Sequence, residues 1–122
     1  MKKFLFIDDE KNFLNTMARC LKRYPNVCFA ECHNIEEALK AIEIHQPDVL
    51  FLDHSFGNQG NEGWQVVELL KDQIQQGQIK VFSTTGDTSD SLKKKYENYG
   101  VKMLNKPFDL GLLIEIINEK YC

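Results

Sequence analysis

Charged and hydroxyl side chains follow four short apolar runs of the 122-residue sequence, at the point where each run ends. An acidic pair, a single aspartate, a threonine-glycine segment and a lysine-proline segment stand there: Asp8-Asp9, Asp53, Thr84-Thr85-Gly86 and Asn105-Lys106-Pro107. One acidic pair after a strand is commonly only the favourable negative charge at a helix N-terminus. Carboxylates, a hydroxyl and an ammonium at four such strand ends indicate a reactive or binding site rather than a set of helix N-terminal caps.

The three aspartates predict a site for a divalent cation. Carboxylates crowded together repel one another, and some stay protonated unless a cation neutralises them. Oxygen ligands without His or Cys suit Mg²⁺, with Mn²⁺ as the alternative, and the spacing is unlike that of a calcium-binding EF-hand loop. We therefore expect Mg²⁺ at Asp8 and Asp9, beside Asp53.

Asp53 is the candidate nucleophile. A metal on the acidic pair and the ammonium of Lys106 would offset the charge of an incoming phosphoryl group, so that a third carboxylate can attack it. Phosphoryl transfer asks mainly for positioning and charge stabilisation. The metal, Lys106 and the Thr85 hydroxyl would each stabilise one phosphoryl oxygen, so the pattern predicts phosphoryl acceptance on Asp53.

Short apolar runs alternate five times with segments of helical period. The expected strands cover residues 4–7, 27–32, 49–52, 81 onwards and 101–104. Five strand–helix units predict an α/β fold: a single (βα)5 domain with a doubly wound parallel five-stranded sheet and helices on both faces. Ligands of such sheets bind beyond the carboxyl ends of the strands, where the polar residues stand.

The expected helices carry signals of their own. Asn34 followed by Glu37 predicts a capping box, and Asp109 predicts the N-cap of the last helix. The third helix is expected to run through Trp64, Val67, Leu70 and Ile74. The last helix is expected to turn Leu113, Ile114, Ile117 and Tyr121 inward, with Leu112 and Ile116 at its flanks.

Composition bounds the class of protein. With 43% hydrophobic and 27% charged residues the chain can fill one core, which excludes a disordered or fibrous chain. A net charge of -3 disfavours direct binding to nucleic acid or to an anionic membrane. The apolar run 4–7 is too short for a signal peptide. The four cysteines fit neither a disulfide framework nor a zinc site and indicate free thiols in the cytoplasm: Cys20, Cys28, Cys32 and Cys122.

These motifs, in this order, resemble a response-regulator receiver domain of two-component signalling over essentially the whole chain, and most of all the stand-alone, chemotaxis-type regulators. The family pattern is an acidic pair, an acceptor aspartate, Thr or Ser before a small residue, and Lys-Pro. Here these are Asp8-Asp9, Asp53, Thr85-Gly86 and Lys106-Pro107-Phe108.

The resemblance implies that Asp53 accepts phosphate from the phosphohistidine of a sensor histidine kinase or phosphotransfer protein. It implies the flavodoxin-like strand order 2-1-3-4-5, a cis peptide bond before Pro107, and a movement of Thr85 that shifts the neighbouring helix. Ser55 and Asp87 would tune dephosphorylation. The implied metal ligands are Asp8, Asp9, Asp53 and the backbone carbonyl of Ser55. Such a protein is no conventional enzyme, although it catalyses its own phosphorylation and dephosphorylation.

The sequence departs from the family at two places. The family glycine stands eight residues after the acceptor, whereas here Gly63 stands ten residues after Asp53, so the loop between them is about two residues longer. Because this loop is rich in Gly and Asn, we expect it to be mobile. The aromatic switch residue is replaced by Met103, a flexible thioether. This predicts switching that is weaker or centred elsewhere, and the open alternative is that Met103 only packs an edge strand. His54 follows the acceptor, but strand alternation predicts that its side chain leaves the pocket.

The expected unit is one receiver domain over residues 1–122 without an output domain, acting as a monomer or weak dimer. Its signal would leave by contact with an unknown output protein, through the surface of the fourth helix, fifth strand and fifth helix. Lys93-Lys94-Lys95 is either a solvated face or a docking site for an acidic partner.

Two alternatives stay open: a phosphorylation-independent interaction module of the same fold, and a receiver domain cut from a larger regulator or hybrid kinase. A haloacid-dehalogenase-type phosphatase is disfavoured because its general-acid aspartate would stand at Ser55. A flavin-binding flavodoxin is disfavoured because the acidic residues 8–10 would repel phosphate.

Overall fold

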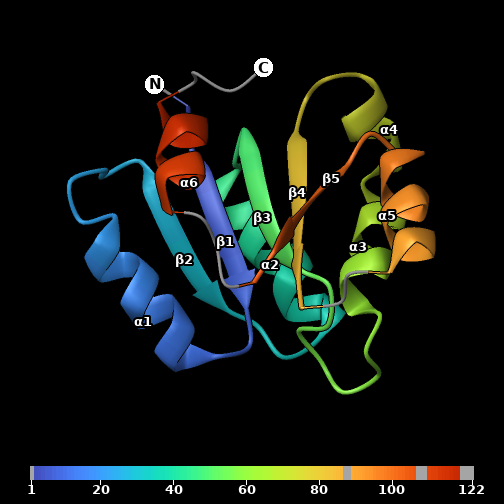
Figure 1. Ribbon diagram of the computed structural model, residues 1–122, viewed down its shortest axis with the longest axis horizontal. Helices are drawn as coiled ribbons and strands as arrows, with labels where there is room; N and C mark the ends of the chain where they lie inside the picture. The colour runs from blue at the N-terminus through green and yellow to red at the C-terminus, as the bar shows by residue number, and fades with distance from the viewer. Residues whose placement is uncertain (1, 87–88, 107–109, 119–122) are drawn as a thin grey trace.

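A five-stranded parallel sheet forms the centre of the computed structural model, which describes residues 2–86, 89–106 and 110–118. The strands are β1 (Phe4–Asp8), β2 (Val27–Glu31), β3 (Val49–Asp53), β4 (Lys80–Thr85) and β5 (Lys102–Asn105). Their order in the sheet is β2-β1-β3-β4-β5, and every neighbouring pair is parallel (Figure 1). The predicted α/β fold and strand order are confirmed.

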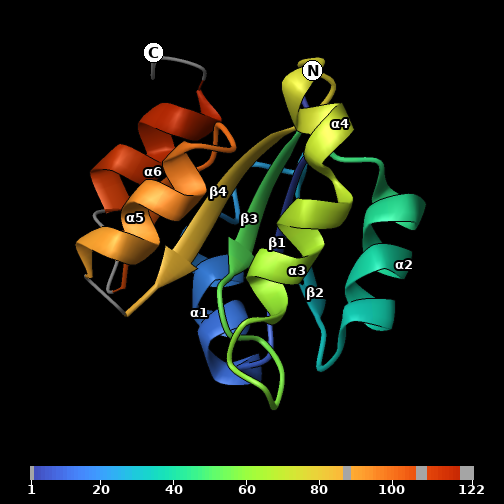
Figure 2. The same cartoon turned by 90° about the vertical axis from the view of Figure 1, so that its right-hand side faces the viewer.

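Within the described residues, six helices flank the sheet: α1 (Lys11–Cys20), α2 (Ile35–His45), α3 (Glu62–Leu69), α4 (Lys71–Gln75), α5 (Asp90–Glu97) and α6 (Leu110–Ile117). Figure 2 shows α1 and α6 on one side of the sheet and α2 and α3 on the other. α5 joins the second group, since its Tyr96 belongs to the core cluster of that face. None of the helices within the described ranges is both long and apolar enough to span a bilayer.

The sheet separates two apolar cores, as strand alternation requires. Leu5 and Ile7 of β1 pack toward α2, α3 and α5, whereas Phe4 and Phe6 pack toward α1 and α6. On the α1–α6 face the Phe6 and Phe51 rings stack with their centroids 4.4 Å apart. The strands β1 and β3 are buried along their whole length, so they fix the positions of the residues at their carboxyl ends.

The start of α2 follows the predicted capping box. The backbone N–H of Glu37 donates to Oδ1 of Asn34 at 2.8 Å. In return the Glu37 carboxylate accepts a 2.7 Å hydrogen bond from the backbone N–H of His33, one residue before the expected donor. These bonds satisfy backbone donors that a helix N-terminus otherwise leaves without partners.

Two predictions about the helices need correction. The expected third helix is broken at Leu70, whose N–H bonds to the carbonyls of both Val66 and Val67, so α3 and α4 are separate. In α6, Ile116 is 6% exposed and lies in the core, whereas Ile114 is only half-buried. Helical period does not determine exactly which side chains of a mostly apolar helix such as α6 face the core, and tertiary packing decides it. The predicted roles of Asp109 and Tyr121 lie outside the described residues.

Candidate functional site

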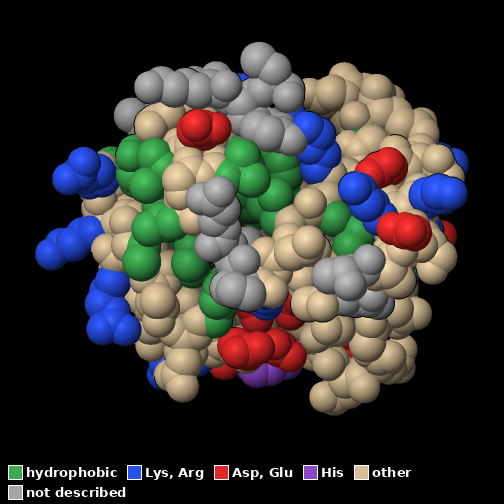
Figure 3. Space-filling model, viewed as in Figure 1, with side chains coloured by type: hydrophobic (Ala, Val, Ile, Leu, Met, Phe, Trp, Pro, Cys, Tyr) green, Lys and Arg blue, Asp and Glu red, His purple; other side chains and the backbone are tan. Residues whose placement is uncertain are grey.

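The predicted site residues stand at one edge of the sheet. Asp8 ends β1 and Asp53 ends β3, and the preceding residues, Ile7 and Leu52, are register partners. Asp53 is in turn opposite Thr84. Figure 3 shows Asp and Glu side chains gathered at the end of the molecule where β1 ends in Figure 1. The parallel sheet therefore brings together residues that lie far apart in the sequence.

Lys106 directly follows β5, the edge strand that pairs with β4 on the side away from β3. β4 and β5 are paired up to Thr85 and Asn105, and the N–H of Lys106 donates to the Thr85 carbonyl at 2.9 Å. Thr85 itself is 4% exposed. This hydrogen bond to β4 therefore fixes the backbone position of Lys106, from which its side chain extends.

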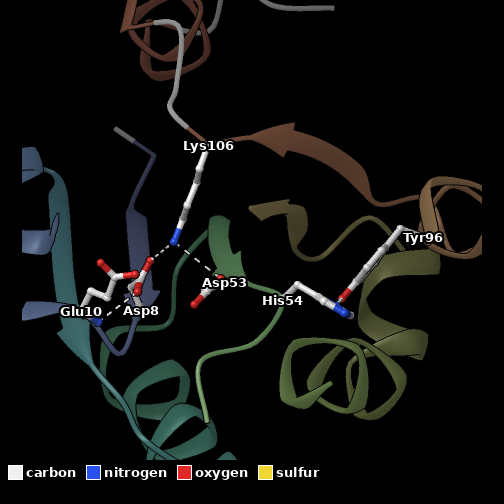
Figure 4. Close-up of polar contacts among 6 residues, drawn as sticks. All are labelled: Asp8, Glu10, Asp53, His54, Tyr96 and Lys106. Atoms are coloured by element: carbon white, nitrogen blue, oxygen red, sulfur yellow. Dashed lines mark hydrogen bonds and ion pairs between the residues drawn. The ribbon is translucent and has the colours of Figure 1, made fainter. Parts of the chain in front are cut away.

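The ammonium of Lys106 bridges the two aspartates (Figure 4). Its Nζ donates to Oδ2 of Asp8 at 2.6 Å and lies 3.6 Å from Oδ1 of Asp53. Burial lowers the pKa of Lys106, but the hydrogen bond that its ammonium donates to Asp8 and the charges of Asp53, Asp8 and Glu10 outweigh burial and raise the pKa. The lysine therefore keeps its positive charge in this partly buried position.

Asp53 lies in an environment that disfavours its own charge. Its pKa is raised to about 6: burial is the largest cause, the negative charges of Asp8 and Asp9 add to it, and Lys106 and the backbone N–H of Ser55 act in the opposite direction. The Asp53 side chain is 9% exposed. Because this buried carboxylate has two anionic neighbours and only one cationic neighbour, an additional positive charge beside it would stabilise its ionised form.

The carboxylates of Asp8, Asp9 and Glu10 form an acidic cluster, with ligand oxygens that all lie within 4.8 Å of one another. Burial and the charge of Asp8 raise the pKa of Asp9. The Glu10 N–H donates to Oδ1 of Asp8 at 3.0 Å, which holds the turn closed. Closely spaced carboxylate oxygens are the donor set that a hard divalent cation prefers, so these residues fit one.

Glu10 is the member of this cluster that the sequence interpretation missed. It directly follows the acidic pair, which is the signal that could have identified it. Asp53 is not part of this cluster of closely spaced carboxylates, and the Lys106 ammonium contacts both Asp53 and Asp8. The roles of Ser55 as a metal ligand and of Asp53 in the metal set remain predictions.

The remaining predicted site residues are Met103, which the structure describes, and Pro107 and Asp87, which lie outside the described residues. Met103 is half-buried on β5 and packs against the core cluster that contains Tyr96. Pro107 and Asp87 lie outside the described residues, so their predicted roles are not addressed by the structure.

His54 leaves the pocket, as strand alternation predicts. Its Nδ1 lies 2.5 Å from the hydroxyl oxygen of Tyr96 on α5, and the two rings meet edge to face with centroids 5.5 Å apart (Figure 4). Tyr96 is completely buried, and this burial is the main cause that raises its pKa to about 12. The sequence indicates Tyr96 as a core position of α5, but its hydroxyl partner could not be predicted.

The loop after Asp53 is organised around the Glu62 carboxylate. Oε2 of Glu62 accepts the Gln59 N–H at 2.7 Å and Oε1 accepts the Gly60 N–H at 3.0 Å. Burial raises the Glu62 pKa, but backbone N–H groups of residues 59–62 outweigh burial and lower it. The predicted mobility of this loop remains a prediction; the contacts show an internal anchor that the sequence pattern did not reveal.

Gly63 allows the start of α3 to touch the end of β3. A Cβ at this position would lie 2.5 Å from the Asp53 carbonyl oxygen and 2.7 Å from the His54 Cα. The Gly63 N–H donates to the His54 carbonyl at 2.9 Å. Only a residue without a side chain permits this approach, so the longer loop still ends at a glycine packed on the backbone of Asp53.

A sequence model described as the response regulator receiver domain matches residues 4–118. The chain belongs to this family. Among curated proteins, this receiver domain is 33% identical over 110 residues to the sensory transduction protein LytT of Bacillus subtilis strain 168. The match covers 89% of the chain but 44% of LytT, so the chain spans less than half the length of that relative.

Solved structures share the fold of this receiver domain at lower sequence identity. The receiver domain of the DNA-binding response regulator merR from Colwellia psychrerythraea 34H has a TM-score of 0.82 at 23% identity, and the match covers 98% of each chain. A two-component response regulator from Clostridium difficile gives a TM-score of 0.77 at 22% identity, again over 98% of each chain. The chemotaxis response regulator CheY4 of Vibrio cholerae gives 0.75 at 21% identity over 99% of each chain.

Family membership confirms the resemblance that the motifs indicated. It supports a role in phosphorylation-based two-component signalling, in which receiver domains interact with histidine kinases and output domains.

Proposed function

We propose that this receiver domain is a phosphorylation-dependent switch that accepts a phosphoryl group from a phosphohistidine donor onto Asp53. The observation that carries the proposal is the Lys106 ammonium between the carboxylates of Asp8 and Asp53, at 2.6 and 3.6 Å. An ammonium held beside a buried carboxylate at the carboxyl edge of a parallel sheet is suited to stabilise a transferred phosphoryl group there.

The proposed reaction is a displacement at phosphorus. A carboxylate oxygen of Asp53 attacks, the new O–P bond forms and the P–N bond of the donor breaks. The bonding electron pair stays on the imidazole nitrogen, which takes up a proton from solvent. Asp53 must be ionised to attack, and with a pKa of about 6 it is mostly ionised at neutral pH. Lys106 and the Thr85 hydroxyl would receive phosphoryl oxygens, and water would later attack the phosphorus and restore the carboxylate.

The donor set at this edge supports Mg²⁺ as the cofactor, with Mn²⁺ as the alternative. Asp8 and Asp9 would hold the ion, with Glu10 adjacent and with Asp53 and the Ser55 carbonyl as the other proposed ligands. When bound, the ion would supply positive charge that offsets the repulsion between the carboxylates and the phosphoryl group. Asp87 and Ser55 stay candidates for tuning the loss of phosphate.

Partners follow from the same proposal. A sensor histidine kinase or phosphotransfer protein would supply the phosphoryl group, and an output protein would recognise the phosphorylated form. In a cytoplasmic setting the chain would act as a monomer or weak dimer. The second candidate function, an interaction module that phosphate does not switch, is favoured by the flexible, half-buried Met103 at the usual position of the aromatic switch.

Intact-mass measurement after treatment with acetyl phosphate or phosphoramidate tests the proposal. The wild-type chain should gain the mass of one phosphoryl group with Mg²⁺ and not with EDTA. Asp53→Asn should gain none, and Lys106→Ala should still bind Mg²⁺ but show a blunted conformational response. A folded wild-type chain that never gains the mass would instead support the unswitched module.

A further inference from the structure

Lys106 has a third neighbour besides the two aspartates. Its Nζ lies 4.6 Å from the centroid of the Phe13 ring, over the face of the ring. Phe13 is on the first turn of α1 and is half-buried, packed against the core cluster of the α1–α6 face. An ammonium at this distance from an aromatic face is attracted to the negative charge of the π system.

The position of Lys106 needs such a constraint. The side chain is long and flexible, and it is 22% exposed, so its two carboxylate partners and solvent compete for the ammonium. The shorter contact is to Asp8, whereas the proposed chemistry takes place at Asp53. Carboxylate contacts change when a cation or a phosphoryl group enters, but the Phe13 ring is uncharged and keeps its attraction for the ammonium.

We propose that Phe13 is a positioning residue for Lys106. Its ring face holds the ammonium above the gap between Asp8 and Asp53, so that the ammonium is already in place when the phosphoryl group arrives. The part of this inference that concerns phosphoryl transfer rests on the proposed function. The contact between the ring and the ammonium can be tested without phosphate.

Phe13 can be changed so that packing and π contact are separated. Phe13→Leu fills the core position with an apolar side chain but removes the aromatic face. Phe13→Tyr keeps the face and should restore the wild-type behaviour. Phe29→Leu is the matched control, because Phe29 is also a half-buried phenylalanine of the same core cluster but stacks on Phe6, with centroids 5.3 Å apart.

The first measurement is the NMR spectrum of the unphosphorylated chain. Protons above the face of an aromatic ring are shielded, so the ε-methylene protons of Lys106 should move downfield in Phe13→Leu and stay near their wild-type shifts in Phe13→Tyr and Phe29→Leu. Unchanged Lys106 shifts in Phe13→Leu would overturn the inference. This measurement decides the contact even if the wild-type chain takes up no phosphate, an outcome that would refute the proposed function separately.

The second measurement is the rate of Mg²⁺-dependent phosphorylation from acetyl phosphate. A cation–π contact of ordinary strength predicts an about three- to ten-fold slower reaction in Phe13→Leu. Combined with Lys106→Ala, the same substitution should cause no further loss, because the residue that Phe13 positions is gone. An equal loss in both backgrounds would mean that Phe13 only supports the fold, and a wild-type rate in Phe13→Leu alone would also overturn the inference.

Discussion

The imidazole of the residue that follows the acceptor is hydrogen-bonded to α5: Nδ1 of His54 lies 2.5 Å from the Tyr96 hydroxyl oxygen. Tyr96 also contacts Trp64 of α3 edge to face, with centroids 5.3 Å apart. The backbone at Asp53 is therefore connected to two helices on the face of the sheet opposite α1 and α6. Met103 packs against the same cluster of core residues, which contains both Trp64 and Tyr96.

Removing the Tyr96 hydroxyl should destabilise the fold. Tyr96→Phe keeps the ring packing but loses a buried hydrogen bond, at a cost of about 1–2 kcal/mol in the free energy of unfolding. Urea denaturation followed by circular dichroism measures this. Tyr99→Phe is the control, because Tyr99 is half-buried and contacts Trp64 edge to face through its ring. Equal stability of Tyr96→Phe and wild type would mean that the pair contributes nothing to the fold.

Asp53→Asn should stabilise the metal-free protein at neutral pH. The folded pKa of about 6 is above the ordinary value of 3.8, so the contribution of Asp53 to stability is fully present below pH ~4 and is lost as the pH rises through about 6. The variant should exceed wild type by about 1–3 kcal/mol at pH 7, after allowance for partial solvent screening, and approach it at pH 4.

Unfolding curves in EDTA between pH 4 and 8 give this comparison. Asp72→Asn, a change at an exposed aspartate of α4, serves as the control and should follow the wild-type pH profile. A constant offset between Asp53→Asn and wild type at every pH would contradict the raised pKa of Asp53.

Strand ends were predictable because a parallel sheet leaves little freedom there. Asp8 and Asp53 end buried apolar strands and Lys106 directly follows β5, and paired parallel strands carry such residues to a common edge. The direction of His54 followed from alternation alone. These inferences needed only the alternation of side chains along a strand and the rule that the carboxyl ends of parallel strands lie at one edge of the sheet.

Loop and helix-end details were not predictable, because they depend on contacts between segments. Nothing in the Gly- and Asn-rich spacing of the loop shows that Glu62 folds back to accept its N–H groups. Helical period continues through Leu70, although the backbone breaks there. The partner of the Tyr96 hydroxyl is His54, directly after β3, and this pairing depends on packing that the sequence pattern does not encode.

Gly63→Ala should be strongly destabilising. The added Cβ would meet the backbone of Asp53 and His54 at 2.5 and 2.7 Å, so the start of α3 must move away from β3. Overpacking of this kind costs about 1–3 kcal/mol. Gly86→Ala is the matched control, since a Cβ there meets nothing within 4 Å. Thermal unfolding of the two variants tests the account, and similar melting temperatures would contradict it.

Glu62→Gln should loosen the loop after Asp53. The neutral amide accepts hydrogen bonds from Gln59 and Gly60 more weakly than the carboxylate does, and the expected loss is about 1 kcal/mol. Amide hydrogen exchange of these two residues should become faster, and protease should cut the loop sooner. Glu68→Gln, at an exposed position of α3, should leave both unchanged. Unaltered exchange in Glu62→Gln would remove the carboxylate as the anchor.

The identity of the phosphorylated side chain tests the central claim most directly. Borohydride reduces an aspartyl phosphate to homoserine, and tandem mass spectrometry of the digested chain then locates the modified residue. After treatment with acetyl phosphate and Mg²⁺, the account predicts homoserine at position 53 and nowhere else. Homoserine at Asp8 or Asp9, or at no position in a folded chain, would contradict it.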